Sequence, residues 1–150
     1  MHVGRADQKM EALAGTRLGR IHSRAANDRA INARFPRADI FQAIRLEPYL
    51  EATADKHPDL KAQLFSLSQR TAKTALTLIH GDVSPKNILL GPDGPVFLDA
   101  QCASIGDPDF DIAFCLNHFL LKCLWTPPAQ HDFIACFPET LPGSLYDVDW

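Results

Sequence analysis

The stretch HGDVSPKN at residues 80–87, followed by VFLDA at residues 96–100, places three short polar side chains beside apolar runs. These side chains are Asp82, Asn87 and Asp99. A buried carboxylate is costly in free energy unless it is paired with another group or bound to a metal ion. The fold of this chain must therefore supply partners or ligands to these groups.

The composition is typical of one globular domain with a buried core. The chain has 150 residues, of which 46% are hydrophobic and 22% are charged. We therefore expect a single domain over residues 1–150. The net charge of −3 is small and the chain has no long run of like charges, which argues against a nucleic-acid surface and against an anionic membrane surface.

The cysteines and the termini favour a cytoplasmic protein with reduced thiols. The four cysteines are Cys102, Cys115, Cys123 and Cys136, and they form no CxxC pair. The N-terminus lacks the apolar segment of a secretory signal, and the most apolar stretch, residues 114–125, is too short to cross a bilayer. A zinc site made by Cys115, His118 and Cys123 is an alternative, although its spacing fits no common zinc motif.

Apolar residues spaced three or four positions apart predict two helices in the first third of the chain. One stripe runs over residues 10–25, where two glycines weaken the pattern. A second runs over about residues 40–56, where Pro48 predicts a kink or a break.

Two further helices have recognisable starts. One begins near residues 58–59, with Asp59 as its expected N-cap. Its expected packed face comprises Leu60, Leu64, Leu67 and Thr71. The other begins after Asp107, with Pro108 at its first helical position. Its expected packed face comprises Phe110, Phe114, Asn117, Leu121 and Leu124. One more short helix is expected after residue 125.

Short strand-forming runs lie between these helices, at residues 77–79, 88–90 and 96–99. The last two are joined by GPDGP, a strong turn signal, which predicts a hairpin. Asn87 would lie just before its first strand and Asp99 at the end of its second strand. The order of elements predicts a mostly helical α+β fold rather than a doubly wound sheet.

Such a hairpin would bring Asn87 and Asp99 together, and the preceding loop would carry Asp82 to the same edge. Three oxygen ligands suit a hard cation such as Mg²⁺, with open positions for phosphate oxygens or water. A carboxylate beside the metal could orient a substrate hydroxyl and accept its proton, as in phosphoryl transfer. Alternatively, Asp82 and Asn87 are ordinary turn residues, because both residue types favour loops.

The region of residues 77–121 resembles the aminoglycoside phosphotransferase and choline kinase-like branch of the protein-kinase-like fold. The resemblance rests on the HGDxxxxN motif, the later Asp99 and the GDPxxDxA motif. The preceding segments LGRIHS (18–23) and FQAIRLEPYL (41–50) also look like the large lobe of that family. The resemblance implies a kinase that uses Mg²⁺ and ATP, or another nucleoside triphosphate, to phosphorylate a hydroxyl of a small molecule.

By the same resemblance, Asp82 is the catalytic residue that positions the acceptor hydroxyl, and Asn87 and Asp99 are the Mg²⁺ ligands. Asp111, in the following helix, would brace the catalytic loop by accepting hydrogen bonds from backbone N–H groups. His80 would be a structural hydrogen-bonding residue of the loop, with a role as general base as the alternative.

Two departures from the family pattern concern single residues. Protein kinases place a lysine two positions after the catalytic Asp, where this chain has Ser84, and its lysine is Lys86. We expect Ser84 and Lys86 to contact the nucleotide phosphates, with a solvated loop lysine as the alternative for Lys86. Many relatives have an acidic residue at the position of Gln101.

The third departure concerns the small lobe. Nothing before residue 77 resembles a Gly-rich strand–turn–strand or a VAIK-like lysine. We therefore expect the chain to form the large, C-terminal lobe with the small lobe absent, and either to self-associate or to need a separate small lobe. A non-catalytic kinase-like binding module and a truncated inactive fragment are the alternatives. A metal-dependent hydrolase would need more carboxylates or histidines than the loop offers.

Overall fold

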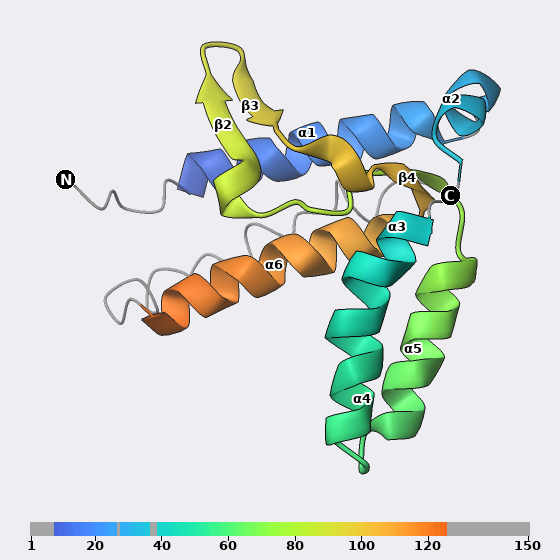
Figure 1. The fold of residues 1–150 in the computed structure, drawn as a ribbon. Helices are drawn as coiled ribbons and strands as arrows, with labels where there is room; N and C mark the ends of the chain where they lie inside the picture. Colours follow the sequence, from blue (N-terminus) through green and yellow to red (C-terminus); the bar gives the residue numbers. More distant parts are fainter. Residues whose placement is uncertain (1–7, 27, 37–38, 126–150) are drawn as a thin grey trace.

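The computed structural model describes residues 8–26, 28–36 and 39–125, in which helices dominate and two small antiparallel sheets lie among them (Figure 1). The helices are α1 (Gln8–Ala25), α2 (Arg29–Arg34), α3 (Asp39–Phe41), η1 (Gln42–Glu51), α4 (Ala52–Lys56), α5 (Lys61–Lys73), η2 (Pro85–Asn87), η3 (Ala100–Cys102) and α6 (Pro108–Trp125). The strands are β1 (Thr77–Ile79), β2 (Ile88–Gly91), β3 (Gly94–Phe97) and β4 (Ser104–Gly106). This arrangement confirms the mostly helical α+β prediction, whereas the short helix expected after residue 125 lies outside the described residues.

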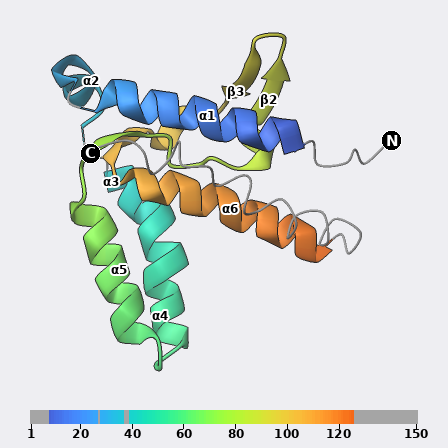
Figure 2. The ribbon, with the colours of Figure 1, turned by 180° about the vertical axis from the view of Figure 1, so that it is seen from behind.

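Helix α1 confirms the first predicted helix, and both glycines of that segment lie inside it. Its inward face carries Ala14, Leu18, His22 and Ala25, which are all buried and lie three or four positions apart. Helix α1 contacts β1 and β3, and Figure 2 shows it crossing the base of the β2–β3 hairpin, which extends beyond it.

The second predicted helix forms without interruption from α3 through η1 to α4. The segment η1 is a π-helix of ten residues that contains Pro48. Proline has no N–H to donate, and the chain passes through it with i→i+5 hydrogen bonds instead of breaking. The side-chain amide of Gln42 donates to Glu51 Oε1 at 2.9 Å, which joins the two ends of η1.

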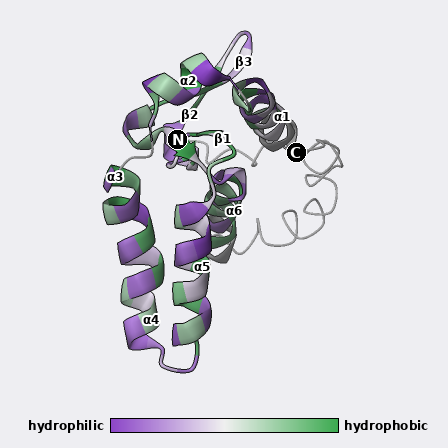
Figure 3. Ribbon diagram, turned by 90° about the vertical axis from the view of Figure 1, so that its right-hand side faces the viewer, coloured by the Kyte–Doolittle hydropathy of each residue, from purple (hydrophilic) through white to green (hydrophobic). Residues whose placement is uncertain are grey.

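Helix α5 lies beside the continuous helix formed by α3, η1 and α4, and these helices project together from the rest of the molecule (Figures 1 and 2). Figure 3 shows hydrophilic and hydrophobic residues alternating along both helices, as expected for an amphipathic pair. The predicted N-cap is wrong, because Leu60 rather than Asp59 precedes the first turn and no side chain caps it.

The predicted packed face of α5 is also partly wrong. Leu60 and Leu67 are 46% and 37% exposed, whereas Ser68 and Thr71 are buried. The Ser68 hydroxyl donates a hydrogen bond to Glu51 Oε1 at 2.7 Å. Because this bond satisfies the hydroxyl, Ser68 can lie on the buried side of α5.

The core lies where η1, α5, β1 and α6 meet. Phe41, Leu46 and Ile79 form its buried cluster, and the Phe110 ring packs edge-on against Phe41 with 4.7 Å between ring centres. Strand β1 pairs with β4, a strand that is too short to be recognised in the sequence. This pairing places the loop that follows Ile79 directly over the core.

The hairpin prediction is confirmed, with Ile88 paired to Phe97 and the turn closed by Gly91 and Gly94. One detail is wrong, because β3 ends at Phe97 and Asp99 lies two residues beyond it. Asp99 has φ 61° and ψ 55°, and a strand cannot continue through this left-handed conformation.

Helix α6 begins at Pro108, and Asp107 Oδ1 accepts a hydrogen bond from the Asp109 N–H at 3.1 Å, as the sequence predicts. Phe114 is buried, but Asn117 and Leu121 are exposed, so the predicted packed face is right only near the start of the helix. The side chain of Leu124 lies outside the described ones. None of the described helices combines the length and the apolarity that a membrane span requires.

We expect Asp107→Asn to stabilise the protein at neutral pH. Burial raises the pKa of the Asp107 carboxyl above its ordinary 3.8, so the folded state binds this proton more tightly than the unfolded chain does. The stability contributed by this group therefore falls as the pH rises from the unfolded pKa through the folded pKa. Asparagine keeps the capping oxygen without the charge, so the variant should melt above the wild type at pH 7.

The difference between the two melting temperatures should shrink as the pH falls below about 4, where the wild-type carboxyl is protonated in both states. Asp107→Ala serves as the control, because it removes the cap and should lose about 1 kcal/mol. A lower melting temperature for Asp107→Asn at pH 7 would show that the buried charge is stabilising instead.

Candidate active site

The loop between β1 and β2 carries five of the predicted site residues on a backbone that folds back on itself, namely His80, Asp82, Ser84, Lys86 and Asn87. Asp82, Ser84 and Asn87 are all at least nine-tenths buried. The Asp82 carbonyl accepts hydrogen bonds from the Ser84 N–H at 2.9 Å and from Asn87 Nδ2 at 3.1 Å. The structure therefore brings the predicted catalytic Asp and the predicted amide ligand into direct contact.

Gly81 allows the tight approach of this loop to the segment that follows the hairpin. Its φ is +75°, which disfavours any residue with a Cβ. A Cβ at this position would also lie 2.9 Å from the Cβ of Cys102, which is fully buried. Only glycine lets the loop lie this close to η3.

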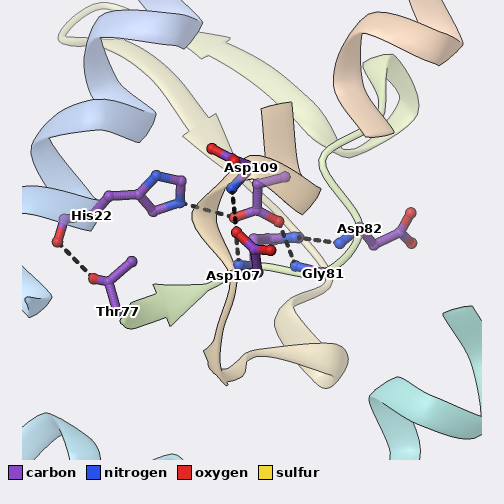
Figure 4. Close-up of polar contacts among 8 residues, drawn as sticks. His22, Thr77, Gly81, Asp82, Asp107 and Asp109 are labelled. Atoms are coloured by element: carbon purple, nitrogen blue, oxygen red, sulfur yellow. Dashed lines mark hydrogen bonds and ion pairs between the residues drawn. The ribbon is translucent and has the colours of Figure 1, made fainter. Parts of the chain in front are cut away.

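The buried Asp111 carboxylate fixes the start of the loop, and Figure 4 labels two of its partners, His22 and Gly81. Its Oδ1 accepts a hydrogen bond from the Gly81 N–H at 2.8 Å, and its Oδ2 accepts one from the His80 N–H at 2.8 Å. His22 Nε2 lies 3.0 Å from Oδ2, and the His22 carbonyl accepts a hydrogen bond from the Thr77 hydroxyl. Helices α1 and α6 therefore hold the loop through one fully buried side chain.

The His80 side chain supports the loop from within. Its Nδ1 accepts a hydrogen bond from the Asp82 N–H at 3.2 Å, which assigns the proton of the neutral ring to Nε2. That Nε2 atom is buried and has no hydrogen-bond partner among the described residues. The hydrogen bond at Nδ1 is compatible with the structural role predicted for His80.

The Asp82 carboxylate points away from this buried network, while its backbone N–H faces it (Figure 4). Asp82 Oδ2 lies 3.0 Å from Arg45 Nη2 and 3.8 Å from Lys86 Nζ. The Lys86 side chain is 71% exposed, so its charge is largely screened by water. The hydroxyl of Ser84 is buried and has no hydrogen-bond partner among the described residues.

Asp99 is exposed, and no described residue makes a hydrogen bond or ion pair with its carboxylate. The N–H of the preceding Leu98 donates to the Asn87 carbonyl at 2.8 Å, so the two ends of the hairpin are joined by the backbone. Burial raises the pKa of the Cys102 thiol, the charge of Arg45 opposes this rise, and the charges of Asp82 and Asp99 add to it.

The available donors fit a hard cation. Asn87 uses its Nδ2 for the hydrogen bond to the Asp82 carbonyl, which leaves its amide oxygen as an acceptor, and the Asp99 carboxylate is exposed. One carboxylate and one amide oxygen are the ligand types that Mg²⁺ takes. The described residues contain no cluster of three or more His, Cys, Asp or Glu side chains that could bind a metal. The zinc alternative gains no support there, although the Cys123 side chain lies outside the described ones.

Two residues beside Asp82 were not predicted from the sequence. Arg45 comes from η1, and His118 comes from α6, where its ring lies 4.7 Å from that of Phe114. Burial lowers the pKa of the His118 imidazole, the charge of Asp82 raises it, and Lys86 and Arg45 lower it. Arg45 lies in the segment 41–50 that resembles the family's large lobe, and His118 was considered only as a zinc ligand, but neither assignment linked the residue to Asp82.

The family model described as "Phosphotransferase enzyme family" matches residues 3–134, which is most of the chain. No curated protein matches the chain. The match confirms the resemblance indicated by the HGDxxxxN and GDPxxDxA motifs, and the small antiparallel sheets among helices are compatible with the protein-kinase-like fold of that family.

We expect Gly81→Ala to destabilise the protein by at least about 1–2 kcal/mol, because the left-handed backbone and the contact with Cys102 both oppose a Cβ. Urea unfolding measures this loss. Gly15→Ala is the matched control, because Gly15 lies within α1 with nothing within 4 Å of an added Cβ. That control should gain about 0.5–1 kcal/mol. Equal effects of the two substitutions would contradict the close approach of the loop to η3.

Proposed function

This chain belongs to the phosphotransferase enzyme family, and from that premise we propose that it is an ATP-dependent kinase of a small molecule. One observation carries the proposal. The loop held by Asp111 directs the Asp82 carboxylate away from the Asp111 hydrogen-bond network, and the same loop brings Asn87 against Asp82 at the base of the hairpin that leads to Asp99. Phosphoryl transfer needs this combination of a hydroxyl-orienting carboxylate and oxygen ligands for a metal.

In the proposed reaction, Asp82 accepts a hydrogen bond from the acceptor hydroxyl and aims its oxygen at the γ-phosphorus. A bond forms between that oxygen and the γ-phosphorus. The bond from the γ-phosphorus to the bridging oxygen breaks, and its electron pair leaves with ADP. The hydroxyl proton passes to Asp82 and from there to solvent.

We propose that Asn87 and Asp99 hold Mg²⁺, which when bound neutralises charge on the nucleotide phosphates. The buried Ser84 hydroxyl has no partner among the described residues, so it is available to donate to a phosphate oxygen. The exposed ammonium of Lys86 would add a positive charge on the same side. We also propose that the described helices form the large lobe and that a small lobe contacts the nucleotide base.

We expect Asp82→Asn to lower the rate of phosphoryl transfer by about 10²–10⁴-fold, because it removes the group that orients the hydroxyl and takes its proton. ADP release over a panel of small hydroxyl compounds measures the rate, with water as a further acceptor. Calorimetric affinity for Mg²⁺ and ATP should change less than about twofold, since Asp82 is not a proposed metal ligand.

Asp59→Asn is the matched control for this experiment, because Asp59 is an exposed acid before α5. It should transfer phosphate at the wild-type rate. Equal rates for the wild type and Asp82→Asn would overturn the proposed kinase activity. Wild-type affinity for Mg²⁺ and ATP together with no transfer by either protein would favour a binding module.

We expect Asp99→Asn to weaken Mg²⁺-dependent ATP binding by about tenfold or more, because it removes a full negative charge from the proposed metal site. Asparagine is the suitable substitution here, because it tolerates the left-handed backbone of this position better than alanine does. Asp93→Asn, in the turn of the same hairpin, should leave the binding heat unchanged. Identical heats for Asp99→Asn and the wild type would remove the metal from the proposal.

A further inference from the structure

The guanidinium of Arg45 is the most confined positive charge beside Asp82. Its side chain is 11% exposed, so the charge is largely removed from water and needs partners within the protein. Three of its nitrogen atoms have them. Nη2 lies 3.0 Å from Asp82 Oδ2, Nε donates to the Gly81 carbonyl at 2.6 Å, and Nη1 donates to the Ile44 carbonyl at 3.1 Å.

The flat face of the same guanidinium is also occupied. The Arg45 Cζ atom lies 5.1 Å from the centre of the Phe114 ring, within the range of a cation–π contact. Phe114 belongs to α6 and is buried. The side chain of Arg45 therefore has contacts to η1, to the loop and to α6, and these contacts fix both its position and its plane.

These contacts hold the Gly81–Asp82 segment from a second side. Asp111 accepts the hydrogen bond of the Gly81 N–H, and Arg45 donates to the Gly81 carbonyl. Arg45 then reaches Oδ2 of the next residue, and the ion pair of Lys86 with this carboxylate is also made at Oδ2. These contacts make Oδ1 the candidate oxygen for a ligand.

We propose that Arg45 is a positioning residue of the phosphotransfer site. By binding Oδ2 it sets the rotation of the Asp82 carboxylate and makes Oδ1 the atom that meets the acceptor hydroxyl. This inference rests on the kinase function proposed above, and it goes beyond that function by assigning a dependence of Asp82 on a residue of η1. Lys86 cannot take this role, because its side chain is exposed and its ammonium lies 3.8 Å from Oδ2.

A double-mutant cycle tests whether Arg45 acts through Asp82 or binds a substrate itself. The four proteins are the wild type, Arg45→Gln, Asp82→Asn and the double variant. The readouts are kcat and the KM for Mg·ATP, from ADP release with water and with any acceptor that the wild type phosphorylates. Arg45→Gln should lower kcat about tenfold or more with the KM for Mg·ATP within about twofold.

In the Asp82→Asn background, the same Arg45→Gln change should alter kcat by less than about twofold, because the group that Arg45 positions is already lost. Arg45→Lys keeps the charge at the buried site but cannot bind Gly81 and Asp82 together, so its kcat should fall between those of the wild type and Arg45→Gln. Arg34→Gln, on the exposed side of α2, should match the wild type in both readouts. Thermal unfolding of every variant checks that each is folded. If Arg45→Gln does not fold, Arg45→Lys takes its place in the test.

Three results separate the two proposals. If the wild type turns over and Arg45→Gln keeps its kcat within about twofold, Arg45 does not position Asp82. If Arg45→Gln lowers kcat equally in both backgrounds, or raises the KM for a phosphorylated acceptor at unchanged kcat, Arg45 contacts a substrate directly and the positioning role is wrong. If the wild type shows no transfer that depends on Asp82, the proposed kinase function itself fails, and the catalytic role of Arg45 fails with it.

Discussion

The fully buried carboxylate of Asp111 is the group on which the site depends. It accepts hydrogen bonds from two consecutive backbone N–H groups, at His80 and Gly81, and it lies 3.0 Å from a ring nitrogen of His22. A buried charge is tolerable when several donors surround it, and these donors come from α1 and from the loop. The cost of burying this charge therefore forces the loop and two helices into one arrangement.

This arrangement gives opposite environments to neighbouring acids. Asp111 is fully buried among backbone donors, whereas the Asp82 carboxylate is paired with the side chain of Arg45, with Lys86 nearby. Asp99 is exposed and has no described partner. Acids that are fully satisfied within the fold can only support it, while acids with open oxygens can bind ligands. The division between structural and chemical roles thus follows from the number of donors around each carboxylate.

The sequence predicted the elements that depend on short-range signals. The hairpin follows from GPDGP, and the start of α6 follows from Asp107 and Pro108, because each signal acts on its own backbone. The sequence placed Asp82 and Asn87 in one loop, but it did not predict that both would be buried. Arg45 could not be predicted, because its partner Gly81 lies 36 positions along the chain and no local pattern reports such a contact. Strand β4 was missed for a related reason, since three residues become a strand only through pairing with β1.

The side-chain hydrogen bond between Gln42 and Glu51 makes η1 sensitive to changes in its length. In an α-helix, with about 3.6 residues per turn, positions nine apart point in opposite directions. These two side chains nevertheless meet at 2.9 Å, because the wider winding of η1 completes about two turns over the same interval. Removing a single residue from this segment would favour ordinary winding and rotate everything on one side of the deletion relative to the other. Glu51 would then no longer face α5 while Arg45 faces the loop. The winding of η1 therefore links the packing of α5 to the position of Arg45 at the site.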